Sequence, residues 1–222
     1  MKSYIVLIRH GITQGILNKW FYGWADLPLV KEGYEQLLKF KEEGAYPEVP
    51  DDAKFYTTGF VRTTETLVTL FGAVPYTEIP EMKEINFGDW ECNTFKQLAE
   101  KEGGQEWLDN ADGTFKFPGG ECMNDYYDRI KRGNEILIGY HRMQELAHRH
   151  SGKDAVSVMI CHGGSISGTM MNWFPNDREV FWDWTPLTGL GYTVYFENGD
   201  PVSYDVLTCE SAKGDSWRKS QI

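Results

Sequence analysis

The sequence predicts an α/β fold built on a mostly parallel sheet, and three stretches carry this prediction. Residues 4–8 and 155–161 are almost entirely apolar, which is typical of strands buried on both faces of a parallel sheet. Residues 189–207 read as a hairpin with Asn198 and Gly199 at its turn, which adds an antiparallel edge. Because we find no internal repeat and no linker composition, we expect one domain over residues 1–222.

The elements between these strands follow from apolar spacing, helix caps and glycine stops. A short helix is expected to begin within residues 12–15, and residues 20–24 form an aromatic loop. Further short strands are expected at residues 53–56 and within 78–91. Helices are expected over residues 32–43, 60–71, 94–101, 121–150 and 165–174. Residues 105–120 are expected to be an irregular loop whose aromatic side chains form a lid or a pocket wall.

The composition indicates an acidic protein that acts on small molecules. Thirty-three acidic residues against 22 basic ones give a net charge of −11, and such a surface repels nucleic acid and anionic membranes. No apolar stretch reaches the roughly 18–20 residues that span a bilayer, and the N-terminus lacks a signal-peptide pattern, so we expect a cytoplasmic protein. A local cluster of arginines can still bind a small phosphorylated substrate, because contact distances are shorter than the screening length.

The cysteines and the C-terminal histidines of the long helix carry no site signature. Four cysteines lie far apart without a CxxC pair, so we expect reduced, mostly buried thiols rather than a zinc site or disulfides. His141, His148 and His150 fall toward the end of the helix expected over residues 121–150. Imidazole suits the helix dipole there, and we interpret all three as surface residues.

Chemistry-bearing residues close both long strands. Arg9, His10 and Gly11 follow the first apolar run, and His162 follows the second. In open α/β sheets, ligands bind beyond the carboxyl ends of the strands. Arg62 falls in the first turn of another expected helix, where a cation opposes the helix dipole but an anion is favoured. Taken alone, Arg62 could equally be a solvated surface arginine and His162 a structural histidine.

Two strand-end histidines, two arginines and one glutamate suit phosphoryl transfer. A neutral imidazole nitrogen can attack phosphorus and form a phosphohistidine. Arginines hold the phosphoryl oxygens, and a second histidine adds a donor. A carboxylic acid protonates the leaving alcohol and, as a carboxylate, then activates the water that cleaves the phosphohistidine. No step needs a metal ion or another cofactor, so we expect neither.

Six ordered motifs between residues 4 and 164 carry a family resemblance. They are Leu7-Ile8-Arg9-His10-Gly11, Phe21-Tyr22-Gly23 with Asp26-Leu27-Pro28-Leu29, Arg62-Thr63 with Thr66, Glu84 with Phe87-Gly88-Asp89-Trp90-Glu91, Pro118-Gly119-Gly120-Glu121, and His162-Gly163-Gly164. This set resembles the histidine phosphatase superfamily, in its branch of phosphoglycerate-mutase-like and α-ribazole-phosphatase-like proteins. The resemblance implies one three-layer α/β domain, whose mostly parallel mixed sheet has helices on both faces.

The resemblance also implies roles for individual residues. His10 corresponds to the nucleophile and Glu84 to the proton donor, while Arg9, Arg62 and His162 correspond to phosphate ligands. The full set of expected substrate-binding residues is Arg9, Arg62, His162, Gly11, Asn18, Trp20, Tyr22 and Gly163.

The sequence departs from the family pattern at three positions near the nucleophile. Ile12 replaces an acidic or small polar residue, Ile16 replaces a phosphate-binding asparagine, and Trp20 replaces an arginine. Asn18 lies two residues beyond the missing asparagine. We expect aromatic walls at the pocket mouth from Trp20, Phe21, Tyr22 and Trp24, from Trp107, Phe115 and Phe117 opposite, and from Trp182 and Trp184 at the rim. Such walls favour a planar or apolar leaving group over a carboxylate.

Three functions are compatible with these residues. The first is a phosphomonoesterase that hydrolyses small phosphorylated metabolites through a phosphohistidine on His10, acting as a monomer or homodimer. The second is a phosphoglycerate mutase that uses the same nucleophile, and the third is a non-catalytic binder of phosphorylated ligands. Trp20 and the Pro-Gly-Gly-Glu motif favour the phosphatase, and the presence of both His10 and Glu84 argues against the binder.

Overall fold

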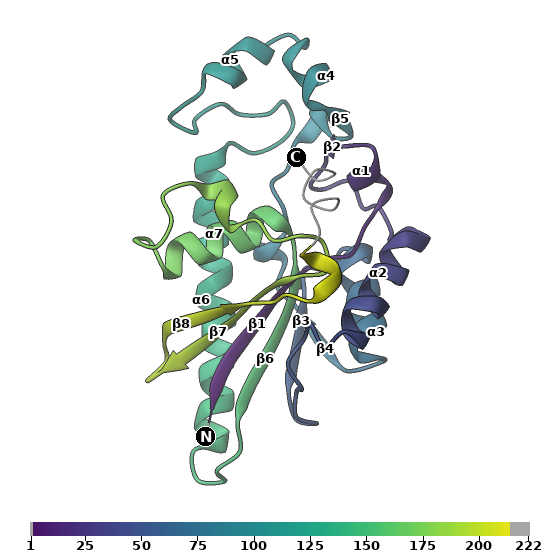
Figure 1. Ribbon diagram of the computed structural model, residues 1–222. Coiled ribbons are helices and arrows are strands. Elements are labelled where there is room, and N and C mark those ends of the chain that lie inside the picture. The colour runs from purple at the N-terminus through teal and green to yellow at the C-terminus, as the bar shows by residue number, and fades with distance from the viewer. Residues whose placement is uncertain (1, 214–222) are drawn as a thin grey trace.

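A six-stranded sheet forms the centre of the computed structural model, which describes residues 2–213 (Figure 1). Its strand order is β4-β3-β6-β1-β7-β8. The strands are β1 (Ser3–Arg9), β3 (Lys54–Thr57), β4 (Tyr76–Glu78), β6 (Ala155–Cys161), β7 (Gly191–Glu197) and β8 (Asp200–Val206). The first four strands of that order run parallel, and the β7–β8 hairpin adds the antiparallel edge. The predicted mostly parallel sheet and its hairpin are confirmed.

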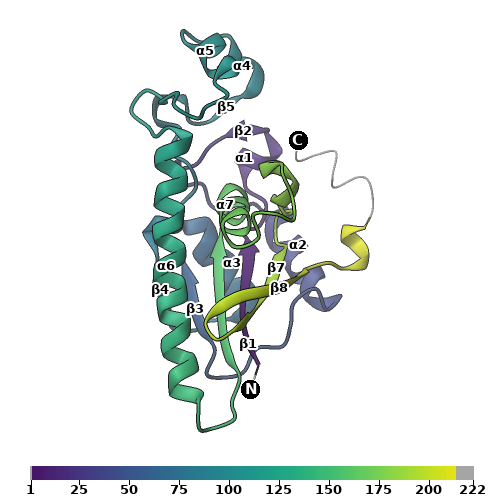
Figure 2. The same ribbon diagram turned by 90° about the vertical axis from the view of Figure 1, so that its left-hand side faces the viewer.

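Helices cover both faces of the sheet, as the three-layer prediction requires (Figure 2). The helices are α1 (Gln14–Leu17), α2 (Lys31–Glu42), α3 (Val61–Phe71), α4 (Phe95–Ala99), α5 (Gly104–Asp109), α6 (Met123–His148) and α7 (Gly163–Trp173). Alternate residues of β1 point to opposite faces. Val6 and Ile8 pack with α2 and α3, whereas Ile5 and Leu7 pack with α6 and α7.

A small cap lies beyond the carboxyl ends of the parallel strands (Figures 1 and 2). It contains α4, α5 and a two-stranded sheet of β2 (Trp20–Phe21) and β5 (Asn93–Thr94). Its core is aromatic, since Trp90 and Phe117 are buried and Trp107 and Phe115 pack against them. The residues that follow β1 and β6 therefore lie between the sheet and this cap.

Two predicted segments around the cap are wrong in detail. Residues 105–120 were expected to be irregular, but α5 occupies the start of this range, because a helix of six residues is too short to show a periodic pattern. The third short strand ends at Glu78 rather than continuing within 78–91. Pro80 has no N–H for a strand ladder and instead starts the 3₁₀ turn Pro80–Met82, and a second turn follows at Gly88–Trp90.

Two side chains expected at the surface are buried instead. His141 is fully buried against the start of the sheet, where its ring contacts the hydroxyls of Ser3 and Ser157. It lies four residues after the buried Leu137 and so shares its helix face. Trp184, expected at the pocket rim, is fully buried and packs against Tyr192. Three of the four cysteine thiols are buried, as expected, and Cys92 is half-buried.

Within the described part of the chain, none of the helices has the length and apolar character needed to cross a bilayer.

Candidate active site

The two strand-end histidines lie side by side, because β1 and β6 are parallel neighbours. Arg9 at the end of β1 is paired with Cys161 at the end of β6, so the next residue of each strand is a histidine. The rings of His10 and His162 are 5.3 Å apart between centroids. Both imidazoles are buried, and His162 also serves as the N-terminal cap residue of α7.

Hydrogen bonding fixes the tautomer of His10. Its Nδ1 lies 2.8 Å from the carbonyl oxygen of Gly11. Because a carbonyl can only accept, Nδ1 carries the hydrogen and Nε2 of the neutral ring keeps its lone pair. Burial, followed by the charges of Arg62 and Arg9, holds the pKa of His10 well below 6.5. His10 is therefore neutral near pH 7, in the form that a nucleophile requires.

His162 has the opposite tautomer. Its Nδ1 accepts a hydrogen bond from Nε of Arg62 at 3.3 Å, so Nε2 carries the hydrogen and donates to Oγ1 of Thr58 at 3.0 Å. Thr58 in turn lies 3.3 Å from Thr63, which donates to the carbonyl oxygen of Phe60. Burial and the neighbouring Arg62 hold the pKa of His162 well below 6.5. The second histidine is thus a neutral partner of the arginine.

Two guanidinium groups face this histidine pair. Arg62 is fully buried, so it is not the solvated surface arginine of the alternative interpretation. It donates to the carbonyl oxygens of Gly23 and Ala25, and its guanidinium lies over the ring of Tyr22. Arg9 donates to the carbonyl oxygen of Pro186 at 2.8 Å. Its Nε would lie 3.1 Å from a Cβ at Gly163, so a side chain there would crowd the guanidinium.

The carboxylate of Glu84 lies in the same cluster and accepts three hydrogen bonds. Tyr126 donates to Oε1 at 2.7 Å, the backbone N–H of Ile85 donates to Oε1 at 3.1 Å, and the backbone N–H of Gly164 donates to Oε2 at 2.9 Å. A Cβ at Gly164 would lie only 2.4 Å from Oε1. The second glycine after His162 is therefore needed for Glu84 to approach α7.

Sequence reasoning missed the residues that hold the Glu84 loop. Arg129 of α6 donates to the carbonyl oxygens of Glu81, Lys83 and Glu84. It also forms a two-pronged ion pair with Glu121, with both N–O distances at 2.7 Å. Tyr126, one turn earlier on α6, is likewise absent from the predicted site. Glu121 of the Pro-Gly-Gly-Glu motif was the one signal in the sequence that pointed to this arrangement.

The nearby acid Glu91 has a different task. It accepts four backbone hydrogen bonds, from the N–H groups of Gly23, Trp24, Ala25 and Phe87. These contacts fix the loop whose carbonyl groups bind Arg62. Glu91 is therefore committed to the loop, whereas Glu84 is the carboxylate that reaches the helix start beside His162.

The remaining predicted binding residues lie at different distances from the histidines. Tyr22 packs against His10 with ring centroids 6.4 Å apart, and its hydroxyl lies 2.5 Å from Oγ1 of Thr13. The N–H of Gly11 donates to Thr66 at 3.0 Å. Asn18 ends α1, where its side chain accepts from Gln14, and Trp20 is paired with Thr94 in the cap sheet. The structure thus brings Tyr22 and Gly11 to the histidine cluster but gives Asn18 and Trp20 other partners.

Four of the nine residues expected in the aromatic wall, Phe21, Trp107, Phe115 and Phe117, belong to the core of the cap. Phe21 contacts Trp107, and Trp107 contacts Phe117, which is buried. Trp24, like Tyr22, lies outside this core. It is 42% exposed, packs against Phe60, and donates from Nε1 to the carbonyl oxygen of Glu84. Phe60 in turn packs against His162, so this pair borders the site.

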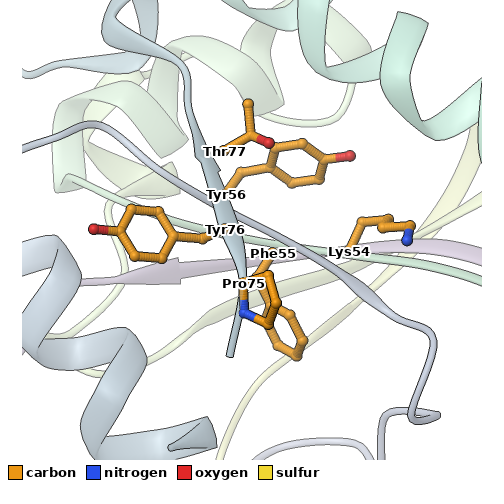
Figure 3. Close-up of a pocket in the computed structure, with 6 residues that line it drawn as sticks. All are labelled: Lys54, Phe55, Tyr56, Pro75, Tyr76 and Thr77. Atoms are coloured by element: carbon orange, nitrogen blue, oxygen red, sulfur yellow. The ribbon is translucent and has the colours of Figure 1, made fainter. Parts of the chain in front are cut away.

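A hollow of about 210 Å³ lies elsewhere, at the β3–β4 edge of the sheet (Figure 3). Lys54, Phe55, Tyr56, Pro75, Tyr76 and Thr77 line it. It includes none of the residues of the histidine cluster. Over residues 2–213, no group of three or more histidine, cysteine, aspartate or glutamate side chains is placed to hold a metal ion.

Comparisons with known proteins identify the family and the fold of the chain. The family model of the histidine phosphatase superfamily (branch 1) matches residues 5–203. A 2,3-bisphosphoglycerate-dependent phosphoglycerate mutase of Bartonella henselae is 26% identical over 216 residues, which cover 91% of this chain and 97% of the relative. A bifunctional protein of Mycobacterium tuberculosis is 28% identical over 151 residues, and the match spans only 40% of that relative.

Solved structures show the same fold. The α-ribazole phosphatase of Shigella flexneri superposes with a TM-score of 0.71 at 21% identity, covering 93% of this chain and 96% of the other. A phosphoglycerate mutase of Thermus thermophilus superposes with a TM-score of 0.59 at 23% identity, covering 94% of this chain and 100% of the other.

Proposed function

Because the chain belongs to the histidine phosphatase superfamily, we propose that it is a phosphomonoesterase that hydrolyses small phosphorylated metabolites through a phosphohistidine on His10. The observation that supports this most directly is the state of His10. Its Nδ1 is held by the Gly11 carbonyl, its pKa is lowered by burial and two arginines, and its Nε2 lone pair is available for attack.

In the first step, Nε2 of His10 attacks phosphorus and the bond to the ester oxygen breaks. Arg9 and Arg62 stabilise the charge on the phosphoryl oxygens. His162, whose ring nitrogens are hydrogen-bonded to Arg62 and Thr58, holds the Arg62 guanidinium in place beside His10. Glu84, in its protonated form, gives its proton to the departing alcohol. The products of this step are the free alcohol, phosphohistidine and the Glu84 carboxylate.

In the second step, water replaces the histidine on phosphorus. The carboxylate of Glu84, held by Tyr126 and the N–H of Gly164, takes a proton from the water as its oxygen attacks. Inorganic phosphate leaves, and His10 and protonated Glu84 are restored. In both steps, arginine side chains of the protein offset the negative charge on the phosphoryl oxygens, and Glu84 supplies or takes the proton.

The second candidate is a phosphoglycerate mutase, and the relatives that bear this name favour it. It would use the same phosphohistidine but return the phosphoryl group to a sugar-acid hydroxyl. The Pro-Gly-Gly-Glu motif favours hydrolysis instead, as the sequence indicates, whereas Trp20 is paired with Thr94 in the cap sheet.

Phosphate release from a panel of alkyl and aryl phosphomonoesters, measured beside interconversion of phosphoglycerates, tests the proposal. Protein quenched during turnover should carry acid-labile phosphate, and His10→Ala should lose both this label and turnover. His150→Ala, at an exposed histidine of the same chain, is the matched control and should retain both. Normal turnover by His10→Ala would refute the mechanism, and phosphoglycerate interconversion faster than any hydrolysis would favour the mutase.

A further inference from the structure

Arg129 and Glu121 surround the segment that carries Glu84 without touching its carboxylate. Arg129 donates to the carbonyl oxygens of Glu81, Lys83 and Glu84 at 2.8, 2.9 and 3.1 Å. Glu121 accepts from the N–H of Asn86 at 3.0 Å. The backbone is thus held on both sides of Glu84.

Arg129 and Glu121, which together we call the clamp, also bind each other. Nε and Nη2 of Arg129 each lie 2.7 Å from a carboxylate oxygen of Glu121, and the two side chains are only 12% and 18% exposed. A planar guanidinium donates in a fixed fork, so its five bonds leave the loop little freedom to shift. Arg129 also projects from α6, a helix of 26 residues, which gives the clamp a rigid base.

The same helix face contacts the carboxylate itself. Tyr126 lies one turn before Arg129, its hydroxyl donates to Oε1 of Glu84, and the Arg129 guanidinium lies over its ring. Residues three apart on a helix are neighbours on one face. The position of the Glu84 backbone and the position of its carboxylate are therefore both set by α6.

We propose that Arg129 and Glu121 are positioning residues that hold Glu84 at the distance required for proton transfer. This inference rests on the proposed function, because it concerns the acid and base of that reaction. A displacement of about 1 Å in a catalytic group can cost roughly 100-fold in rate. Loss of the clamp should therefore slow only the events in which Glu84 moves a proton.

The predicted signature separates kcat/KM from kcat. With an alkyl phosphate, breaking the ester bond needs the proton of Glu84, so Arg129→Met should lower kcat/KM by about 100-fold. With an aryl phosphate of an acidic phenol, the leaving group needs little protonation, so kcat/KM should change less than about threefold. The kcat of Arg129→Met with the aryl phosphate should fall, because hydrolysis of the phosphohistidine still needs Glu84 as a base. A burst of phenol should therefore precede steady turnover.

Arg142→Met is the matched control. Arg142 lies on the same helix and also donates to a backbone carbonyl, that of Gly199, and to Asp200. It should change neither rate constant, since its partners lie in the β7–β8 turn. Glu121→Gln is a milder second variant that keeps an acceptor oxygen. Like Arg129→Met, it should lower kcat/KM more for the alkyl phosphate than for the aryl phosphate, but by a smaller factor.

Two results would overturn the inference. One is an equal loss of kcat/KM for alkyl and aryl phosphates in Arg129→Met and Glu121→Gln, which indicates a structural role only. The other is a full further loss when Arg129→Met is added to Glu84→Gln, because a residue that acts through Glu84 has no effect once that acid is gone. Failure of wild-type protein to hydrolyse either ester would instead refute the proposed function.

Discussion

Acidification should destabilise this protein through a buried histidine outside the candidate active site. The ring of His141 is fully buried, and burial lowers its pKa from 6.5 to about 4. Ser3 donates its one hydroxyl hydrogen to Glu145, so it must accept from Nε2–H of His141, and Ser157 must donate to Nδ1. These hydrogen bonds fit the neutral ring, and a second ring proton on Nδ1 would displace the hydroxyl hydrogen that Ser157 directs at it.

The sign of the effect follows from proton uptake. The unfolded chain protonates His141 near pH 6.5, whereas the folded protein does so only near pH 4. Between these values the unfolded state binds more protons, so the free energy of unfolding falls as the pH is lowered. From pH 7 to pH 4.5, His141 alone should account for a loss of roughly 2.5 kcal/mol.

Urea unfolding at pH 7 and pH 4.5 measures this loss. His141→Gln removes the titrating ring, so its free energy of unfolding should fall by roughly 2.5 kcal/mol less than that of the wild type over the same interval. The difference between the wild-type decrease and the His141→Gln decrease in the free energy of unfolding excludes the contributions of His10 and His162, because both proteins retain these buried histidines. The exposed control His150→Gln should keep the wild-type pH dependence. Equal losses in wild type and His141→Gln would refute the reasoning.

Three further predictions concern the candidate site. Glu84→Gln should lower kcat/KM by about 100-fold or more for alkyl phosphates and much less for aryl phosphates, whereas an equal loss would remove Glu84 from the acid role. Gly164→Ala places a Cβ 2.4 Å from Oε1 of Glu84 and should reproduce that selectivity. Gly168→Ala, whose Cβ would come no nearer than 3.3 Å to its closest neighbour, Ile130, should retain activity. Identical kinetics of the two variants would contradict the steric argument. Turnover should survive prolonged dialysis against EDTA, and recovery only on adding magnesium or zinc would mean that the site needs a cation.

The histidine pair could be predicted from the sequence because each ring directly follows a buried strand. Apolar runs predict such strands well, and parallel strands that end level bring the next residues together, as at His10 and His162. Arg62 could be placed at a helix start for the same reason. Its burial could not be predicted, because it depends on carbonyl groups from the distant loop at Gly23 and Ala25.

The residues that position Glu84 leave a weaker trace in the sequence. Tyr126 and Arg129 look like ordinary members of a long amphipathic helix, since the periodicity gives a helix face but not what that face meets. The aromatic wall was misjudged for a related reason. Tryptophan and phenylalanine side chains suit a pocket and a small core equally well, and Phe117 with Trp107 became the core of the cap.

Helix α6 spans the height of the sheet, and at about 1.5 Å per residue it is a rod of roughly 40 Å (Figure 2). Near its start Tyr126 and Arg129 meet the Glu84 loop, and about four turns after Tyr126 the side chain of His141 enters the sheet core. Adding or deleting one residue between them would rotate the two ends by about 100° relative to each other. The helix can therefore accept many substitutions on its outer face but not a change in length. Natural variants of this protein should keep the spacing between these positions even where the residues between them differ.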